Sequence, residues 1–297
     1  EGGVTDAILA CGKATRPFES DFRKIAPKGL RLHFAYEPSP LGTGGAIRFA
    51  YDELKRRVPV SGPVVVFNGD VFFELNIRKF AAFHRSRRSD GTIALTRVDD
   101  VSRFGVVKTD RRGQVQKFIE KPQRPVGTNF VNAGAYLLES DWIERIPSGT
   151  VVSIERDSFP DSLRRRGRLF GFSMAGYWND IGTIATYLQA HADLASTRNR
   201  WTGGMFSRKS GRAVIGAGGR VGRGVTFSGF VCLGPNVMVG DGASLKDVVV
   251  LEGTRIGAGV RAERTIIGRR CRIGANCDLS AGTALGDDSK ITDYTRC

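Results

Sequence analysis

The chain has 297 residues, of which 41% are apolar, and a formal net charge of +15; these values exclude general disorder and allow two domains of ordinary size. No apolar run is long enough to span a membrane and no signal peptide is visible, so we expect a cytoplasmic protein without a membrane partner. The basic excess is mostly arginine without interleaved aromatic residues, which favours a solvated surface that attracts nucleotide phosphates over a nucleic-acid partner.

The cysteines indicate no special chemistry. There are five, scattered along the chain at Cys11, Cys232, Cys271, Cys277 and Cys297. The lack of a C-x-x-C pair argues against a zinc or redox motif. An odd number in a chain of this length argues against a disulfide framework.

The first predicted elements lead to a glycine-rich loop. We expect a strand, a short helix, a strand and a longer helix at Val4–Ala10, Pro17–Ile25, Leu30–Tyr36 and about Ala46–Arg57. The loop before the longer helix, at 37–45, reads E-P-S-P-L-G-T-G-G. Three glycines in four residues allow the backbone to approach a flat or anionic ligand, although the same pattern is common in structural turns.

The stretch V-V-V-F-N-G-D at 64–70 reads as a strand followed by a turn. Its apolar run is typical of a strand covered on both faces, and Asn68 and Gly69 end that run. Asp70 then lies just past the carboxyl end of the strand, where ligands bind in open α/β sheets. A carboxylate there is suited to Mg²⁺, whereas an isolated turn aspartate would more often cap the next helix.

Strands and helices alternate through the rest of the first 200 residues. We expect helices at Ile77–Arg88, from Ser153 onward and from Ile184 to about Ser196, and strands at Thr92–Arg97, Gly105–Thr109, Val115–Ile119 and Asn129–Leu138. A four-residue loop, Asp110–Gly113, forms a hairpin between the second and third of these strands. Asn132 and Gly134 lie inside the last strand, where a glycine often marks a close approach. This alternation predicts a mainly parallel sheet covered by helices.

From about residue 200 onward the chain repeats every six residues. Apolar residues recur in two series, at Ile215, Val221, Phe227, Leu233, Val239, Leu245 and Leu251, and then at Ile267, Ile273, Leu279, Leu285 and Ile291. This hexapeptide pattern predicts a parallel β-helix, in which Cys271 and Cys277 are packing residues. The gap between the two series is two residues short of three hexapeptides, so we expect one coil with tight turns.

These residues together resemble a known family. Seven motifs stand in family order: E-P-S-P-L-G-T-G-G-A at 37–46, N-G-D at 68–70, F-G-V-V at 104–107, E-K-P at 120–122, N-A-G at 132–134, S-I-E-R-D at 153–157 and W-N-D-I-G-T at 178–183. The chain resembles sugar-1-phosphate nucleotidylyltransferases over nearly its whole length. With the hexapeptide repeats, it is most similar to the mannose-1-phosphate guanylyltransferase branch.

The resemblance implies a fold of class α/β with two domains. Residues 1–200 would form a Rossmann-like nucleotidyltransferase domain and residues 201–297 a left-handed parallel β-helix. The family's opening strand and its loop of the type G-G-x-G-T-R-L-x-P-L-T, which supply phosphate contacts, have no counterpart here. We therefore expect an N-terminally incomplete domain, and weak or no turnover from residues 1–297 alone.

The resemblance also implies the catalytic residues. Asp70 and Asp180 would hold Mg²⁺ together, and Lys121 would meet the sugar phosphate as a point charge. Each has a simpler alternative, because Asp180 could cap the following helix and Lys121 could be an exposed lysine before a proline.

The remaining predicted contacts bind substrate. Glu120 and Asn132 resemble the pair that hydrogen-bonds sugar hydroxyls, and Glu37 could accept from the two donors on the pairing edge of guanine. The predicted substrate-binding residues are Glu37, Leu41, Gly42, Thr43, Gly44, Asn68, Gly69, Gly105, Glu120, Asn132 and Glu155. Surface charge is the alternative for Glu120, and helix-terminus stabilisation is the alternative for Glu155.

Two hypotheses follow from the resemblance. The first is an enzyme that transfers a nucleotidyl group from a nucleoside triphosphate, expected to be GTP, to mannose-1-phosphate, with heptose- and glucose-1-phosphate enzymes as rivals. The second is a non-catalytic binding or regulatory subunit of the same fold. The two candidate metal carboxylates favour the enzyme. We also expect a homo-oligomer formed through the β-helix, because the end of a coil stack needs a cover.

Overall fold

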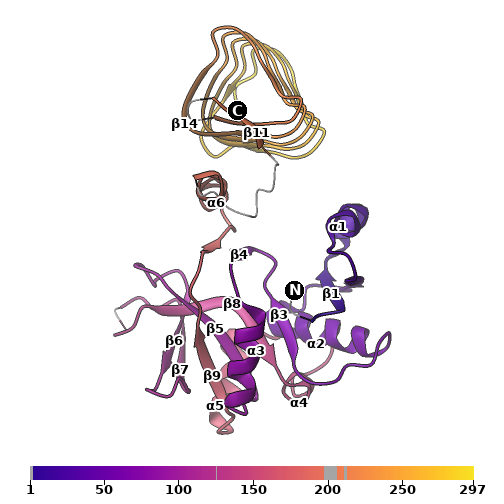
Figure 1. The fold of residues 1–297 in the computed structure, drawn as a ribbon, viewed down its shortest axis with the longest axis vertical. Coiled ribbons are helices and arrows are strands. Elements are labelled where there is room, and N and C mark those ends of the chain that lie inside the picture. Colours follow the sequence, from indigo (N-terminus) through magenta and orange to yellow (C-terminus); the bar gives the residue numbers. More distant parts are fainter. Residues whose placement is uncertain (1–2, 125, 197–205, 211–212) are drawn as a thin grey trace. The chain divides into compact units, whose positions relative to one another are not determined.

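Two compact units make up the structure (Figure 1). This computed structural model describes residues 3–124, 126–196, 206–210 and 213–297, and the chain divides into Glu1–Trp178 and Asn179–Cys297. The predicted domain boundary between residues 200 and 201 lies outside the described residues. Within the described ranges, no helix is both long and apolar enough to cross a membrane.

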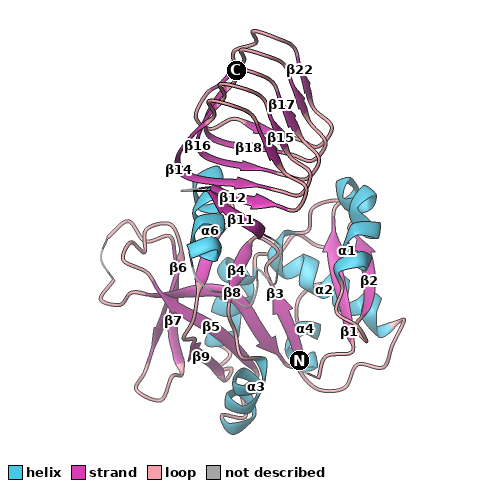
Figure 2. Ribbon diagram, turned by 45° about the horizontal axis from the view of Figure 1, so that its top comes forward, coloured by secondary structure: helices cyan, strands magenta, loops and turns pink. Residues whose placement is uncertain are grey.

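A six-stranded sheet forms the centre of the first unit (Figure 2). The strand order is β7-β6-β8-β5-β9, and β3 also pairs with β8. The strands are β3 (Val64–Phe67), β5 (Gly91–Arg97), β6 (Gly105–Thr109), β7 (Val115–Glu120), β8 (Phe130–Leu138) and β9 (Leu169–Ser173). The helices α3 (Ile77–Ser86), α4 (Ser140–Glu144) and α5 (Phe159–Arg164) belong to the same unit.

The prediction of a mainly parallel sheet is wrong. The pair β5–β9 is parallel, but β3, β5 and β6 are each antiparallel to β8, and β6 and β7 form the predicted hairpin. Parallel neighbours need a crossover connection, usually a helix. Between β5 and β8 the chain forms only that hairpin, so β8 returns antiparallel along β5.

A smaller parallel pair precedes this sheet along the chain. It consists of β1 (Asp6–Cys11) and β2 (Arg31–Tyr36), joined through a 3₁₀ helix (Lys13–Phe18) and α1 (Glu19–Ile25). The next helix, α2 (Gly42–Lys55), begins four residues before its predicted start. The glycine-rich stretch is therefore the first turn of a helix, whose amide groups have no partner inside the helix.

Strand β3 contacts apolar clusters on both faces, as its sequence predicts. Val64 and Val66 pack against one buried cluster and Val65 against another. Phe67, the last residue of the strand, departs from this pattern because it is 46% exposed. A short strand, β4 (Val71–Phe73), follows the turn after β3. The turn that carries Asp70 is thus held between two strands.

The second unit contains α6 (Ile184–Ser196) and the predicted parallel β-helix. One seven-stranded sheet contains β11 (Phe206–Ser210), β12 (Ala213–Gly216), β14 (Thr226–Leu233), β16 (Ser244–Val250), β18 (Arg261–Ile267), β20 (Asp278–Leu279) and β21 (Ala284–Leu285). A five-stranded sheet contains β13 (Arg220–Val221), β15 (Met238–Val239), β17 (Arg255–Ile256), β19 (Arg272–Ile273) and β22 (Lys290–Ile291). All pairings given for these two sheets are parallel except that of β11 with β12.

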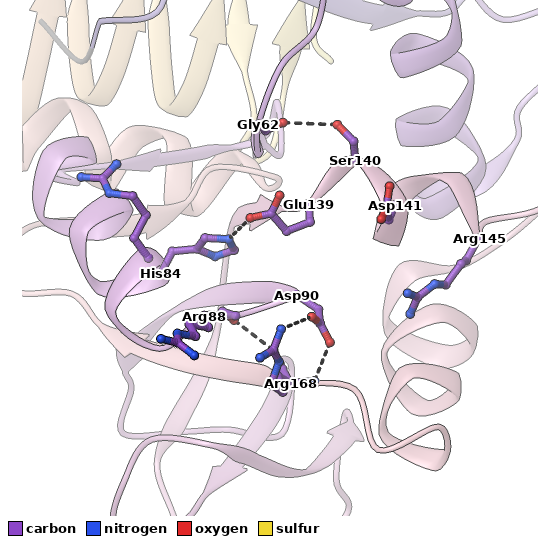
Figure 3. Close-up of a pocket in the computed structure, with 11 residues that line it drawn as sticks. Gly62, His84, Arg88, Asp90, Glu139, Ser140, Asp141, Arg145 and Arg168 are labelled. Carbon is purple, nitrogen blue, oxygen red and sulfur yellow. Dashed lines mark hydrogen bonds and ion pairs between the residues drawn. The ribbon is translucent and has the colours of Figure 1, made fainter.

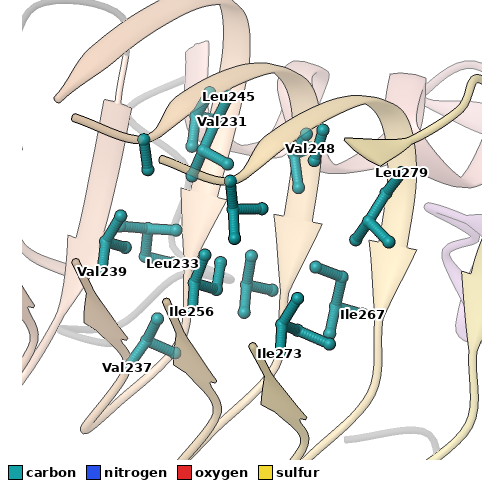
Figure 4. Packing of buried hydrophobic residues seen from close by; sticks show 14 of the residues in the cluster. Val231, Leu233, Val237, Val239, Leu245, Val248, Ile256, Ile267, Ile273 and Leu279 are labelled. Carbon is teal, nitrogen blue, oxygen red and sulfur yellow. The ribbon is translucent and has the colours of Figure 1, made fainter. Parts of the chain in front are cut away.

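The hexapeptide residues line the core of the β-helix (Figure 4), with one correction. Leu233 pairs with Val250, which pairs with Ile267, so Val250 faces the core and Leu251 does not. Two successive coils, rather than one, are each a residue shorter than their neighbours. The shortening falls at the corner where Asp247 and Arg264 take left-handed backbone angles, with φ of 53° and 46°.

The outer face of the seven-stranded sheet is apolar where α6 covers it. Cys232, Val249 and Ile266 are neighbours on three successive coils and form a cluster with Leu188 of α6, and Leu251 packs against the same cluster. All five cysteines of the chain are free, and Cys271 and Cys277 are buried in the core as packing residues, as predicted.

Candidate active site

Asp70 lies in the turn between β3 and β4. Its side chain is exposed, and within the described residues no hydrogen bond or ion pair involves its carboxylate. It does not cap the next helix, because Asn76 occupies that position and accepts a hydrogen bond from the Lys79 amide at 3.0 Å. The carboxylate oxygens of Asp70 are therefore available to a ligand.

A buried tyrosine on β8 connects several of the predicted site residues. The hydroxyl of Tyr136 accepts from Asn132 Nδ2 at 2.8 Å and is also hydrogen-bonded by the side chain of Asn68. Burial raises the pKa of Tyr136, and the negative charges of Glu155 and Asp70 raise it further. The sequence does not single out Tyr136, since a tyrosine in an apolar strand reads as an ordinary core residue.

A left-handed glycine brings these groups together. Gly134 has φ of +73°, and the pairing of β8 with β5 shifts register around it. Its amide donates to Asn132 Oδ1 at 3.0 Å, and its carbonyl accepts from the Asn68 amide at 2.8 Å. A Cβ at this position would lie 3.1 Å from Asn68 Nδ2. Glycine at position 134 thus allows the N-A-G motif at 132–134 and the N-G-D motif at 68–70 to lie close together.

The E-K-P motif ends β7 beside a glycine of β6. Gly105 pairs with Glu120, and a Cβ on Gly105 would lie 2.6 Å from the ring of Phe118, so a larger residue would force that ring to move. Lys121 has φ of +44°, unusual for a residue before a proline, and its side chain is 63% exposed. Its Nζ lies 4.0 Å from Glu120 Oε1. The left-handed backbone sets the direction of the Lys121 side chain, and its exposed ammonium group can reach a ligand.

Two carboxylates in the site repel each other. Burial and then the charge of Glu155 raise the pKa of Glu120 above its ordinary value. The cations of Lys121 and Arg156 offset part of that rise. Glu120 and Glu155 come from β7 and from the π-helix at Ile154–Ser158, so two motifs far apart in sequence meet here.

A hydrogen bond joins the segment predicted to contact the base to the segment predicted to contact the sugar. Thr43, in the first turn of α2, donates from Oγ1 to Glu155 Oε2 at 2.9 Å. The same hydroxyl accepts from the Ile154 amide at 2.9 Å, and Ser153 Oγ donates to Glu155 Oε2 at 3.0 Å. The start of α2 and the segment at 153–155 therefore hold each other in place.

The glycines of α2 serve packing within the chain. The amides of Gly44 and Gly45 donate to the Val152 carbonyl at 2.8 and 3.2 Å. A Cβ on Gly42 would lie 2.7 Å from that carbonyl oxygen, and a Cβ on Gly45 would lie 2.5 Å from the Thr150 carbonyl oxygen. The sequence predicts a close approach to a ligand at these glycines, and this stays a prediction, because in the structure the group that approaches them is the chain's own backbone.

Glu37 and Leu41 form a fixed turn before α2. Leu41 is buried, and its amide donates to Glu37 Oε2 at 2.9 Å. Its carbonyl accepts from the Val152 amide at 2.9 Å. One carboxylate oxygen of Glu37 therefore holds the turn, and Oε1 is the oxygen left for a ligand.

Asp180 is the last residue of β10 (Trp178–Asp180). Its Oδ1 accepts from the Gly182 amide at 2.9 Å. The alternative reading of Asp180 as a helix cap is not borne out, because Thr183 precedes α6 and its hydroxyl accepts from the Thr186 amide at 3.2 Å. Asp180 therefore keeps carboxylate oxygen lone pairs for another ligand.

A metal ion at this site would need ligands from the substrate and water as well as from the protein. In the part of the chain that the structure describes, no group of three or more His, Cys, Asp or Glu side chains could hold a metal ion. Mg²⁺ needs no such cage, because it is usually bound by one or two carboxylates together with substrate phosphates and water. The exposed, unpaired carboxylate of Asp70 fits that donor set.

A separate cavity of about 640 Å³ lies at the opposite end of β3 (Figure 3). Two of its acidic groups already have partners: Glu139 Oε1 lies 3.1 Å from the buried His84 Nε2, and Asp90 binds Arg168 through the backbone amide at 2.8 Å and Nη2 at 3.1 Å. Asp70 follows the last residue of β3, whereas this cavity begins at Gly62, before the first. The cavity is distinct from the predicted site.

Comparisons with known proteins match both units. Residues 1–197 match the family model described as nucleotidyl transferase, and residues 209–297 match the model described as GMPPB C-terminal domain. A mannose-1-phosphate guanylyltransferase of Mycobacterium tuberculosis is 34% identical over 88% of this chain and 71% of its own length. A mannose-1-phosphate guanyltransferase of Neurospora crassa is 32% identical over 98% of this chain and 81% of its own length.

Solved structures of another protein also match this chain. HddC from Yersinia pseudotuberculosis is 32% identical and matches with a TM-score of 0.54, covering 65% of this chain and 80% of that chain. The same protein solved in complex with GMP-PN matches with 31% identity and a TM-score of 0.54.

The carboxylate pair gives a test of this geometry. We expect Glu155→Gln to lower the pKa of Glu120, because the charge of Glu155 is removed while burial stays, and the amide oxygen of Gln can still accept from Thr43 and Ser153. NMR titration of the Glu120 carboxyl carbon measures the shift. Asp141→Asn, which removes an exposed carboxylate beside the separate cavity, is the control. An unchanged Glu120 pKa in Glu155→Gln would contradict the proximity of the two groups.

Proposed function

This chain belongs to the nucleotidyl transferase family, and we propose that it transfers a guanylyl group from GTP to mannose-1-phosphate, releasing pyrophosphate and GDP-mannose. The observation that carries the proposal is the hydrogen bond from Thr43 to Glu155. It fixes the loop expected to face the base against a carboxylate expected to face the sugar. The relatives named mannose-1-phosphate guanylyltransferases support this choice of substrates.

The reaction needs positioning and charge compensation rather than a covalent intermediate. A phosphate oxygen of the sugar phosphate attacks the α-phosphorus of the triphosphate, a new P–O bond forms, and the bond to the β-phosphate breaks. The electron pair of the broken bond leaves on pyrophosphate. No protein group has to act as a nucleophile, so the site must hold two anionic substrates against their mutual repulsion.

We propose that Asp70 and Asp180 hold Mg²⁺. When bound, the ion would neutralise charge on the phosphates and orient them. Asp70 has available carboxylate oxygens, and Asp180 keeps lone pairs beyond the one that accepts from the Gly182 amide at 2.9 Å. Both observations support the assignment, since Mg²⁺ takes carboxylate oxygens as ligands.

Lys121 is the proposed contact to the sugar phosphate. Its backbone lies in the left-handed region, with φ of +44°, and its amide donates to the Phe104 carbonyl at 3.1 Å. Strained backbone of this kind is found where the surrounding structure holds a side chain for function. Glu120, with its raised pKa, and Asn132 supply hydrogen-bonding groups for sugar hydroxyls.

The metal assignment is tested by Asp70→Asn. The rate is measured in a chain joined to an opening segment of the type G-G-x-G-T-R-L-x-P-L-T, because residues 1–297 alone are expected to turn over weakly or not at all. We expect pyrophosphate release with Mg²⁺ to fall about a hundredfold or more, the scale of losing one group that stabilises developing charge. Circular dichroism should show the fold retained, because the side chain is exposed. Asp141→Asn should keep normal turnover. Near-normal turnover of Asp70→Asn would remove this carboxylate from the mechanism.

The base and the sugar are tested by a substrate panel. We expect GTP to be preferred over dTTP, UTP and ATP, because Glu37 Oε1 can accept from donors on the pairing edge of guanine. Mannose-1-phosphate should be preferred over glucose- and heptose-1-phosphate. The measurement is kcat/KM from pyrophosphate release for each combination, in the chain joined to an opening segment of the type G-G-x-G-T-R-L-x-P-L-T. Preference for dTTP or ATP would assign the chain to another branch of the family.

We also propose that the β-helix mediates self-association. Leu285 and Ile291 are only partly buried, whereas Leu245 in an inner coil is fully buried. A second chain packed against these two residues would complete their cover. Sedimentation velocity should show a dimer or larger species, and Leu285→Lys should shift it towards monomer. Sedimentation of the unmodified chain as a monomer would contradict the proposal.

A further inference from the structure

The five-stranded sheet of the β-helix carries a column of cations on successive coils. Arg255 on β17 pairs with Arg272 on β19, which pairs with Lys290 on β22, and all three side chains are exposed. The strands that carry them are neighbours in the stack (Figure 2). We call these three residues the basic column. Adjacent strands lie about 4.8 Å apart, so the three charges occupy a row about 10 Å long.

Such a column is electrostatically unfavourable by itself. Like charges directly opposite on adjacent strands destabilise a sheet. Within the described residues, no hydrogen bond or ion pair involves the side chains of Arg255, Arg272 or Lys290. The β-helix therefore keeps three uncompensated cations in one row.

The same β-helix compensates charge elsewhere. On the seven-stranded sheet, Lys246 stands opposite Glu263 in the register, and Lys246 Nζ lies 2.8 Å from Glu263 Oε1. Close to the basic column, Arg270 binds Asp288 through Nε at 2.8 Å and Nη2 at 2.7 Å. The absence of an acidic partner for the basic column is thus a local feature and not a general property of the stack.

A cavity lies over the basic column. It has a volume of about 450 Å³ and is lined by Gly253, Arg255, Arg270, Arg272, Asp288 and Lys290. This volume is in the range of small-molecule sites. Because Asp288 is already bound by Arg270, the cavity presents three available cations and no available carboxylate.

We propose that this cavity binds a small oligophosphate, meaning a chain of two or three linked phosphates, either free or as part of a nucleotide. One phosphate group carries at most about two negative charges, which would leave part of the column uncompensated. A linear chain of phosphates can contact the cations of all three coils. Guanidinium groups suit phosphate because their planar set of donors matches its oxygens.

The basic column does not continue towards the start of the stack. In the same register, the coil before Arg255 carries Met238, which has no charge and does not line the cavity. The cavity volume of about 450 Å³ favours a compact ligand over an extended nucleic acid.

The test is calorimetric titration of the full chain with sodium tripolyphosphate, without added metal. We expect Arg272→Gln to weaken binding at least tenfold, because it removes the central cation, and Arg272→Lys to recover part of the loss. Arg220→Gln is the matched control, since Arg220 lies in the same register two coils before Arg255 but outside the cavity. It should bind as the unmodified chain does. Thermal melting checks that each variant folds.

Further titrations identify the ligand. Orthophosphate should bind at least tenfold more weakly than tripolyphosphate. Because GTP is also the proposed substrate of the other site, the comparison with GTP uses only the affinity that Arg272→Gln removes, and a larger loss for GTP than for tripolyphosphate assigns a nucleotide to the cavity. Raising the salt concentration should weaken binding, because exposed charges are screened. The proposal is overturned if Arg272→Gln binds as tightly as the unmodified chain, if Arg220→Gln loses as much affinity, or if tripolyphosphate does not bind. Tighter binding of a single-stranded oligonucleotide would overturn the assignment to a small ligand.

Discussion

The left-handed backbone at Gly134 is the constraint on which the candidate site depends. At φ of +73° the strand bulges, so that Asn132 and Tyr136 lie within hydrogen-bonding distance although they are four positions apart in sequence. The same bulge leaves room for Asn68, which precedes Asp70. Any side chain at 134 would meet Asn68 and would also strain the backbone. One glycine thus sets the distance between two sequence motifs.

Sequence reasoning found the glycines of the site but not their partners. The glycines at 42–45 predict a close approach to a ligand, whereas the structure shows a close approach to the chain's own backbone. What approaches there is the backbone at Val152, which no local pattern reveals because it lies about a hundred residues later. Tyr136 was missed for a related reason. Its role comes from Asn68 and Asn132 reaching its hydroxyl, whereas its own sequence context is that of a core strand.

The fold can be predicted best where the sequence repeats with a fixed period. The six-residue repeat fixes which side chains face the β-helix core, and almost all of them do so. The exception, Leu251, follows a corner where one residue, Asp247, takes the place of two, so the register slips by one and Val250 turns inward. The sheet of the first unit has no such period. Its direction depends on β8 returning without a crossover, a matter of tertiary pairing.

Both units keep like charges close together, and this has a thermodynamic consequence. Folding raises the pKa of Glu120, so the native state holds its proton more tightly than the unfolded chain does. Stability from this group is present below its unfolded pKa and is lost as the pH rises through its folded pKa. With both carboxylates ionised, Glu120 and Glu155 oppose folding, as the three cations of the basic column do. Natural sequences retain such conflicts mainly at functional sites, where a ligand relieves them. By this argument, hydrogen-bond donors of a ligand would relieve the repulsion within the carboxylate pair, and a bound anion would relieve the repulsion within the basic column.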